Sequence, residues 1–358
     1  MDTLKIAVPI AQVAVGHKGL QQAATWLRAG KLVAFPTETV YGLGADARQD
    51  EAVARIFTAK DRPQDNPLIV HVADRRQLEE WTESIPTVAE QLMQRFWPGP
   101  LSIVLSVKKG VLSEVVTAGL PTVAVRMPDH PTALELIRAA NIPIAAPSAN
   151  RSGRPSPTQA DHVLEDLSGR IAAVVDSGPT GIGLESTVVT VDHGRVQILR
   201  PGGISVHELR AAGFIVDDDC FDDQSETSLA PQSPGVKYTH YAPKGRLLLV
   251  QGADIATSTR QKVQRHVQAQ IEMNRTLRTA VLTYDEHVAS YQADLVISLG
   301  SIDDMDQWAK TLYAALRTCD AEQIEWIVAE FYPRTDGLGL ALSNRLLKAA
   351  GYNRIIVS

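Results

Sequence analysis

The stretch from Val216 to Pro243 constrains the fold most, because its composition differs from that of the chain on either side. Five aspartates lie between 217 and 223, and the following residues are rich in Ser, Pro and Gly, which is typical of a linker. The chain of 358 residues also exceeds the roughly 250–300 residues at which single hydrophobic cores stop growing. We therefore predict two domains, residues 1–215 and 244–358, joined by a linker over residues 216–243.

The part after the linker has the pattern of a small Rossmann-like domain. Apolar segments alternate with helical patterns over residues 257–271, 305–318 and 339–350, which predicts a parallel sheet. The strands are expected at Leu247–Val250, Thr279–Thr283, Leu295–Ser298, Ile324–Glu330 and Ile355–Val357. The sequence has neither GxGxxG after a strand nor GxxxxGK[ST], so it lacks the two commonest nucleotide-binding loops.

Residues 1–215 contain more strand patterns than a simple alternation of strands and helices would give. Helical spacing is present at Gln21–Ala29 and at Glu51–Lys60, where Asp50 is the expected N-cap. Strands are predicted at Lys31–Phe35, Leu68–Val72, Leu101–Val107, Thr122–Met127, Ile142–Ala146, Val174–Ser177, Ser186–Val191 and Val196–Arg200. The expected fold class is α/β, with a mixed twisted sheet and helices.

Polar groups cluster between Phe35 and His71. The loop Pro36–Gly44 follows a strand, so its hydroxyls and carboxylate either cap a turn or line a ligand crevice. The next helix ends in Lys60-Asp61-Arg62, whose two cations either relieve the helix dipole or grip a polyanion. A histidine that ends an apolar strand, as His71 does, is more often a core residue than a ligand-binding one.

A second polar loop, Pro147–Thr158, lies between a strand and a helix and carries four hydroxyls, an amide, two arginines and three prolines. It is either a stiff connection or a pre-ordered set of donors for phosphate or ribose. Arg126 lies in an apolar strand and needs a buried partner or an anionic ligand, because an unpaired buried charge costs several kcal/mol. These residues predict a pocket that binds anions without an obvious protein nucleophile.

Bulk composition limits the partners and the compartment. The net charge of −6 argues against a nucleic-acid scaffold and against stable direct tRNA binding. Cys220 and Cys319 match no metal or disulfide spacing, and the N-terminus has neither a signal-peptide pattern nor a membrane-spanning run. A cytoplasmic protein is therefore expected.

The motifs together resemble those of the threonylcarbamoyl-AMP synthases, the YrdC-like enzymes, in their long two-domain form. In chain order they are FPTETVYGLGADA, KDRPQDNPLIVHV, FWPGPLSIVL, VAVRMPDHP, APSANRSGRPSPT, ESTVV, ILRPGGIS, SPGVKYTHYAPKG and GLGLALSNRLLKAA. The resemblance implies a YrdC-type catalytic domain, a linker and a Rossmann-like accessory domain. It also implies that L-threonine, bicarbonate and ATP give threonylcarbamoyl-AMP and pyrophosphate, with magnesium on the triphosphate.

The resemblance also implies roles for individual residues. The catalytic set would be Lys60, Arg62, Ser148 and Asn150. ATP would contact Arg62, Asn66, Thr122, Ser148, Ser156, Arg200 and Tyr241, and Tyr241 of the linker would close over the nucleotide. Threonine would lie among Thr39, His71, Arg126, Ser186 and the backbone around Ala146.

The anion pocket agrees with such chemistry, because both bond-forming steps use substrate nucleophiles and the protein supplies positioning and charge stabilisation. The product would be passed to tRNA threonylcarbamoyl transferase enzymes, which modify the adenosine beside the anticodon. The alternative is an RNA- or nucleotide-binding module without turnover.

Overall fold

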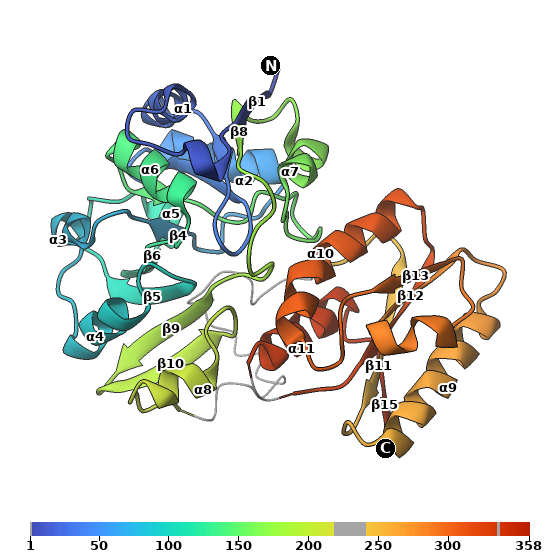
Figure 1. Ribbon diagram of the computed structural model, residues 1–358. Coiled ribbons are helices and arrows are strands. Elements are labelled where there is room, and N and C mark those ends of the chain that lie inside the picture. The colour runs from blue at the N-terminus through green and yellow to red at the C-terminus, as the bar shows by residue number, and fades with distance from the viewer. Residues whose placement is uncertain (1, 218–240, 335–336) are drawn as a thin grey trace. The chain divides into compact units, whose positions relative to one another are not determined.

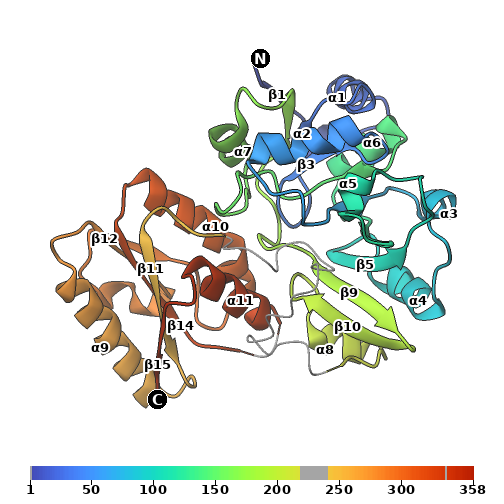
Figure 2. The same ribbon diagram turned by 180° about the vertical axis from the view of Figure 1, so that it is seen from behind.

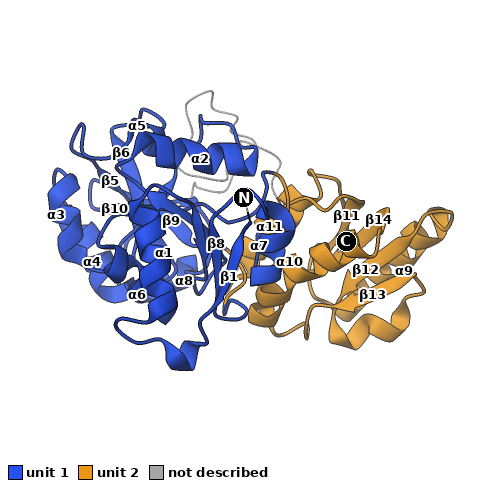
Figure 3. Cartoon of the chain, turned by 90° about the horizontal axis from the view of Figure 1, so that it is seen from above, with its two compact units in different colours: residues 1–152, 156–181, 185–238 blue, residues 153–155, 182–184, 239–358 orange. Residues whose placement is uncertain are grey.

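The computed structural model describes residues 2–217, 241–334 and 337–358 (Figure 1). The chain forms two compact units (Figure 3). The first comprises residues 1–152, 156–181 and 185–238, and the second comprises residues 153–155, 182–184 and 239–358. Most of the predicted linker, including Lys237, Tyr238 and His240, lies outside the described residues.

The first unit contains a mixed sheet of ten strands in the order β1-β8-β2-β3-β7-β4-β6-β5-β9-β10. The strands are β1 (Leu4–Ala7), β2 (Val33–Phe35), β3 (Gly42–Asp46), β4 (Ile69–His71), β5 (Leu101–Ser106), β6 (Thr122–Arg126), β7 (Ile144–Ala145), β8 (Ala173–Asp176), β9 (Thr187–Asp192) and β10 (Arg195–Arg200). Strand β4 is parallel to β6 and antiparallel to β7, so the predicted mixed sheet is confirmed.

Helices cover both faces of this sheet (Figures 1 and 2). They are α1 (Lys18–Arg28), α2 (Asp50–Lys60), α3 (Leu78–Trp81), α4 (Thr87–Phe96), α5 (Glu114–Thr117), α6 (Pro131–Ala140), α7 (Ala160–Leu167) and α8 (Val206–Ala211), with 3₁₀ turns at Ile10–Gln12 and Arg75–Gln77. Because side chains alternate along a strand, Val33 and Phe35 join the core beneath α1 and α6, whereas Ala34 joins the core beneath α2 and α7.

Two local predictions were wrong. Asp50 is the first residue of α2 and not its N-cap, which is Gln49 without a side-chain hydrogen bond. The polar loop after β2 is shorter than predicted, because β3 begins at Gly42. Glycine weakens a strand signal, but here it allows close packing. A Cβ on Gly44 would lie 2.9 Å from the Phe35 ring and 3.0 Å from Ile144.

The second unit is the predicted Rossmann-like domain. Its five strands form an entirely parallel sheet in the order β13-β12-β14-β11-β15. The elements are β11 (Arg246–Gly252), α9 (Thr257–Met273), β12 (Thr279–Thr283), a 3₁₀ helix at Asp285–Ser290, β13 (Leu295–Ser298), α10 (Met305–Ala321), β14 (Trp326–Phe331), α11 (Gly339–Ala349) and β15 (Arg354–Val357). In the part of the chain that the structure describes, no helix has the length and apolar character needed to span a bilayer.

Candidate active site

Strand β4 runs through the middle of the residues predicted to bind the substrates. At its carboxyl end, His71 lies beside Arg126 at the end of the parallel strand β6. Asn66 precedes its amino end, and Thr122 is the first residue of β6, paired with Ser106 of β5. Asn66 and His71 are five residues apart, about 16 Å of extended chain. His71 and Arg126 of the predicted threonine set thus lie at one end of β4, and Asn66 of the predicted ATP set precedes the other end.

Arg126 is buried and binds the loop after β2. Its Nη1 donates to Thr39 Oγ1 at 2.9 Å and its Nε to the Gly99 carbonyl at 3.3 Å, while its Nη2 lies 2.6 Å from Glu38 Oε1. The turn that presents this carbonyl requires glycine, because a Cβ on Gly99 would lie 2.2 Å from the Phe96 carbonyl oxygen. Of the two possibilities expected from the sequence, a buried partner is present in Glu38, and the binding of an anionic ligand stays a prediction.

His71 is fully enclosed at this end of the site. Burial, reinforced by the nearby positive charge of Arg126, lowers the pKa of His71 to about 3, so the imidazole is neutral at physiological pH. Its Nδ1 has no hydrogen-bond partner among the described residues. His71 is thus both a core residue, in edge contact with Phe35, and a polar group with unused hydrogen-bonding capacity.

Lys60, Ser148 and Asn150 meet beyond the other end of β4. The Lys60 ammonium is 2% exposed and donates to the backbone carbonyls of Ser148 and, at 2.5 Å, of Asn150. Ser148 Oγ donates to Asn150 Oδ1 at 2.6 Å. The sequence left open whether Lys60 relieves the helix dipole or grips an anion, and the structure shows that it holds the backbone of the second polar loop.

Arg62 and Asn66 lie in the segment that follows the C-terminal end of α2. Asp61 takes a left-handed conformation with φ of 53° and binds Arg151 and Arg170, whose hydrogen bonds lower the pKa of Asp61. The chain then turns so that Arg62 Nη2 donates to the Asn66 carbonyl at 3.3 Å. Asn66 is 1% exposed, yet neither polar atom of its side chain has a hydrogen-bond partner among the described residues.

Arg200 is a second buried arginine, and it binds the backbone and side chain of Ser186. Arg200 Nη2 donates to the Ser186 carbonyl at 2.8 Å, and Ser186 Oγ lies 2.8 Å from Ser102 Oγ. Gly202 makes this packing possible, because a Cβ there would lie 2.3 Å from the Glu185 carbonyl oxygen. Ser156, which the family resemblance assigns to the ATP site, donates its hydroxyl proton to Glu185 Oε1 at 2.6 Å.

Tyr241 belongs to the second unit. Its side chain is 5% exposed, stacks on Tyr313 with ring centroids 5.3 Å apart, and lies beneath the Arg345 guanidinium at 5.2 Å. Its predicted contact with the nucleotide stays a prediction.

Sequence reasoning missed two polar residues that contact the predicted set, namely Ser102 and Glu185. Glu185 was visible inside the motif ESTVV but was assigned no role, and the carboxylate of Glu38 was expected to cap a turn or line a crevice without a named partner. Ser102 carries no signal, because a single serine in an apolar strand is common.

Buried polar atoms without hydrogen-bond partners occur at both ends of β4. They include both side-chain oxygens of Glu38, both polar atoms of the Asn66 amide, His71 Nδ1, Arg126 Nη2 and His130 Nδ1. Natural proteins rarely leave such atoms unpaired, because each costs about 1–3 kcal/mol. The arrangement fits a binding site whose ligand completes these hydrogen bonds.

Family models match both halves of the chain. Residues 25–202 match the model described as "Telomere recombination", and residues 204–351 match the model described as "Threonylcarbamoyl-AMP synthase, C-terminal domain".

Whole-chain relatives agree with these matches. The chain is similar to the threonylcarbamoyl-AMP synthase of Bacillus subtilis, with 51% identity over 333 residues that cover 93% of each protein. It is 47% identical to that of Pyrococcus abyssi, over 94% of this chain and 95% of the relative. The solved structure of P. abyssi Sua5 complexed with L-threonine superposes with a TM-score of 0.88 at 42% identity and covers 100% of both chains.

Proposed function

Because the chain belongs to the threonylcarbamoyl-AMP synthase family, we propose that its first unit joins L-threonine, bicarbonate and ATP into threonylcarbamoyl-AMP and pyrophosphate. The chain is an enzyme of the nucleotidyltransferase type. The observation that best supports a site for two substrates is the distribution of unpaired buried polar atoms, toward both ends of β4. The alternative, a binding module without turnover, is not favoured, since relatives that match this chain over nearly its whole length bear the name of the enzyme.

The amino acid is assigned to the end formed by Thr39, His71 and Arg126. Arg126 is the cation for the threonine carboxylate, and it is held by Thr39 on one side and Gly99 on the other. The neutral His71 accepts or donates a hydrogen bond without adding a second positive charge beside Arg126. The Ala146 backbone, which donates to the Ile69 carbonyl at 2.9 Å, and Ser186 complete the proposed threonine set.

The nucleotide is assigned to the end formed by Lys60, Arg62, Asn66, Ser148 and Asn150. Thr122, Ser156, Arg200 and Tyr241 are added to this assignment from the family resemblance. Arginine forms a forked contact with phosphate, and the Asn66 amide offers a donor and an acceptor that the described residues leave unused. Lys60 keeps the Ser148–Asn150 backbone in place for the reacting phosphate.

In this mechanism the threonine ammonium first loses a proton to solvent. The free amine then attacks CO₂ with loss of a second proton, or bicarbonate with loss of water, and gives a carbamate. The carbamate oxygen then attacks the α-phosphate while pyrophosphate leaves. No protein nucleophile is needed. Holding the reactants together supplies up to about 7–11 kcal/mol of the barrier reduction, and the cations stabilise charge that develops on phosphate.

Magnesium is proposed to bind the triphosphate, whose oxygens are the hard ligands that this ion prefers. In the described part of the chain no three His, Cys, Asp or Glu residues gather as a metal-binding group. The ion is therefore assigned to the substrate, and no residue is assigned to it. We also propose that the protein works in the cytoplasm and that its product serves the enzymes that threonylcarbamoylate tRNA beside the anticodon.

The test is pyrophosphate release by the purified protein with threonine, bicarbonate, ATP and magnesium. Release should require threonine, and chelation of magnesium with EDTA should abolish it. Pyrophosphate at the level of the threonine-free control would overturn the proposal. A salt-dependent gel shift with tRNA, in the absence of such release, would instead support the binding module.

A further inference from the structure

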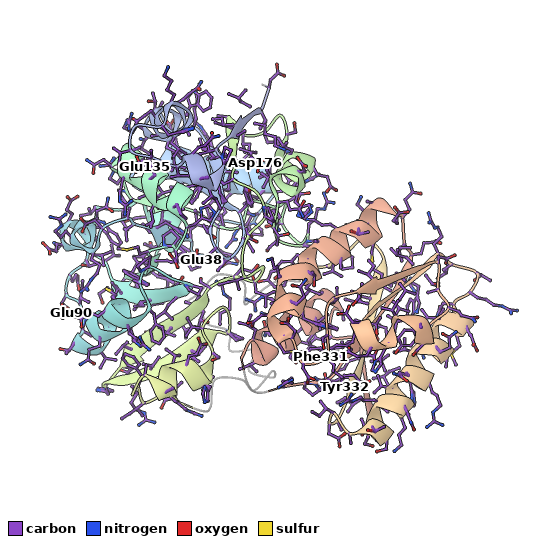
Figure 4. The ribbon with its side chains drawn as sticks, viewed as in Figure 1. Glu38, Glu90, Glu135, Asp176, Phe331 and Tyr332 are labelled. Atoms are coloured by element: carbon purple, nitrogen blue, oxygen red, sulfur yellow. The ribbon has the colours of Figure 1, made fainter. Side chains whose placement is uncertain are left out.

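Glu38 lies at the end of the site that is proposed to bind threonine, but no role has been assigned to it so far. It sits between Thr37 and Thr39 in the loop after β2 (Figure 4). Its side chain is 12% exposed, and that of its partner Arg126 is 4% exposed. A carboxylate and a guanidinium with so little contact with water need good hydrogen bonds to offset their desolvation.

The contact between these two groups lacks such bonds. Glu38 Oε1 and Arg126 Nη2 are 2.6 Å apart and form an ion pair, but among the described residues neither atom makes a hydrogen bond. Glu38 Oε2 likewise has no hydrogen-bond partner in this part of the chain. The pair therefore has charge attraction, together with an unused donor on the arginine and unused acceptors on the glutamate.

The loop fixes the Glu38 backbone. Thr37 Oγ1 donates to the Val40 carbonyl at 2.7 Å and accepts from the backbone N–H groups of Thr39 and Val40. Since this uses the only Thr37 hydroxyl proton, Thr39 donates to Thr37 Oγ1, 2.8 Å away, and presents its lone pairs to Arg126. The polar groups around Arg126 are thus ordered before any substrate arrives.

The charges around Glu38 favour a cation. Besides Arg126, the nearby titratable groups are Asp129, His130 and His71. Burial raises the pKa of Asp129 and the Glu38 charge raises it further, whereas burial lowers the pKa values of both histidines. Two acidic side chains, Glu38 and Asp129, and two imidazoles whose pKa values are lowered thus accompany one guanidinium.

We propose that Glu38 binds the ammonium group of the amino-acid substrate while Arg126 binds its carboxylate. A zwitterion inserted between them replaces the direct ion pair by two hydrogen-bonded ones, and it engages Arg126 Nη2 and the Glu38 oxygens. This selects a free α-amino acid over the corresponding acid that lacks the amine. The inference rests on the proposed function, because it takes the threonine site to be at this end of β4.

The experiment compares three ligands on wild type and Glu38→Gln by calorimetry, without turnover. The ligands are L-threonine, 3-hydroxybutyrate, which lacks the amine, and 1-amino-2-propanol, which lacks the carboxylate. In Glu38→Gln, threonine and aminopropanol should bind about 10- to 100-fold more weakly, whereas 3-hydroxybutyrate should keep its affinity. The exposed Glu90 of α4, which Figure 4 also labels, provides the control Glu90→Gln, which should leave all three affinities unchanged.

Two outcomes of the binding comparison contradict the inference. Unchanged threonine affinity in Glu38→Gln, with threonine-dependent pyrophosphate release by wild type, overturns the role of Glu38 and leaves the proposed function intact. Equal loss for threonine and 3-hydroxybutyrate means that Glu38 only positions Arg126. Failure of wild type to release pyrophosphate concerns the proposed function instead. If Glu38→Gln unfolds, Glu38→Asp replaces it: this variant keeps the charge and should restore binding of aminopropanol more fully than Glu38→Ala does.

Discussion

Replacement of Asn66 by leucine separates the binding role of this residue from a structural one. Asn66 is 1% exposed, and neither polar atom of its amide has a hydrogen-bond partner among the described residues. Burying two such atoms without partners costs about 1–3 kcal/mol each. Leucine has a similar volume and no polar atoms, so Asn66→Leu should leave the free energy of unfolding unchanged or raise it by up to about 2 kcal/mol.

The same substitution should weaken the use of ATP. A hydrogen bond to a charged phosphate contributes about 1.5–3 kcal/mol, and about 1.4 kcal/mol corresponds to a factor of ten. We therefore expect the KM for ATP to rise about 10- to 100-fold while the KM for threonine changes little. Steady-state pyrophosphate release measures both constants, and urea denaturation measures stability.

The control is Thr82→Val. Thr82 is 3% exposed, and its hydroxyl donates to the Leu78 carbonyl at 2.6 Å. Its removal should lower stability by about 1 kcal/mol without changing either KM. The reasoning is refuted if Asn66→Leu loses more stability than Thr82→Val and keeps its KM for ATP, because Asn66 would then have a structural partner.

Three further predictions use other residues of the two units. For His71, the pKa is about 3 in the folded protein and about 6.5 when unfolded, so the unfolded state binds more protons between these values. The contribution of the neutral His71 to the free energy of unfolding is complete above pH 6.5 and falls by about 1.4 kcal/mol per pH unit on acidification toward pH 3. His71→Gln should therefore reduce the slope of the free energy of unfolding against pH by that amount. An unchanged slope would contradict the low pKa of His71. Lys60→Met removes the charged donor to two backbone carbonyls. It should lower the free energy of unfolding by about 2–4 kcal/mol and kcat/KM by at least about 100-fold. The control Lys109→Met, at an exposed lysine, should change neither quantity. Tyr241→Ala should destabilise the second unit by about 3 kcal/mol, because the contacts with Tyr313 and Arg345 are lost. Tyr241→Phe keeps these contacts and removes only the hydroxyl. A raised KM for ATP in Tyr241→Phe supports a role of Tyr241 in nucleotide binding, and an unchanged KM argues against it.

The order of elements in the second unit followed from the sequence alone. Each strand from β11 to β15 is a short apolar run bounded by polar or helical segments, and a regular alternation of this kind is compatible with few folds. The position of β3 did not follow in the same way, because two of its five residues are glycines. Its pairing with β2 and β7 depends on close contacts with Phe35 and Ile144, and these exist only after the sheet has formed.

The site shows the same division. The sequence determined which residue types are available: arginines and a lysine at the ends of strands and helices, hydroxyls in stiff loops, and no P-loop. Only the tertiary structure decided their partners. It paired Arg126 with Glu38 and placed Lys60 under the Ser148–Asn150 backbone. It also buried the Asn66 amide where no described residue forms a hydrogen bond with it. The physical reason is that residue type sets charge and hydrogen-bonding capacity, whereas burial and the choice of partner come from segments that are distant in the chain and meet only through the register of the sheet.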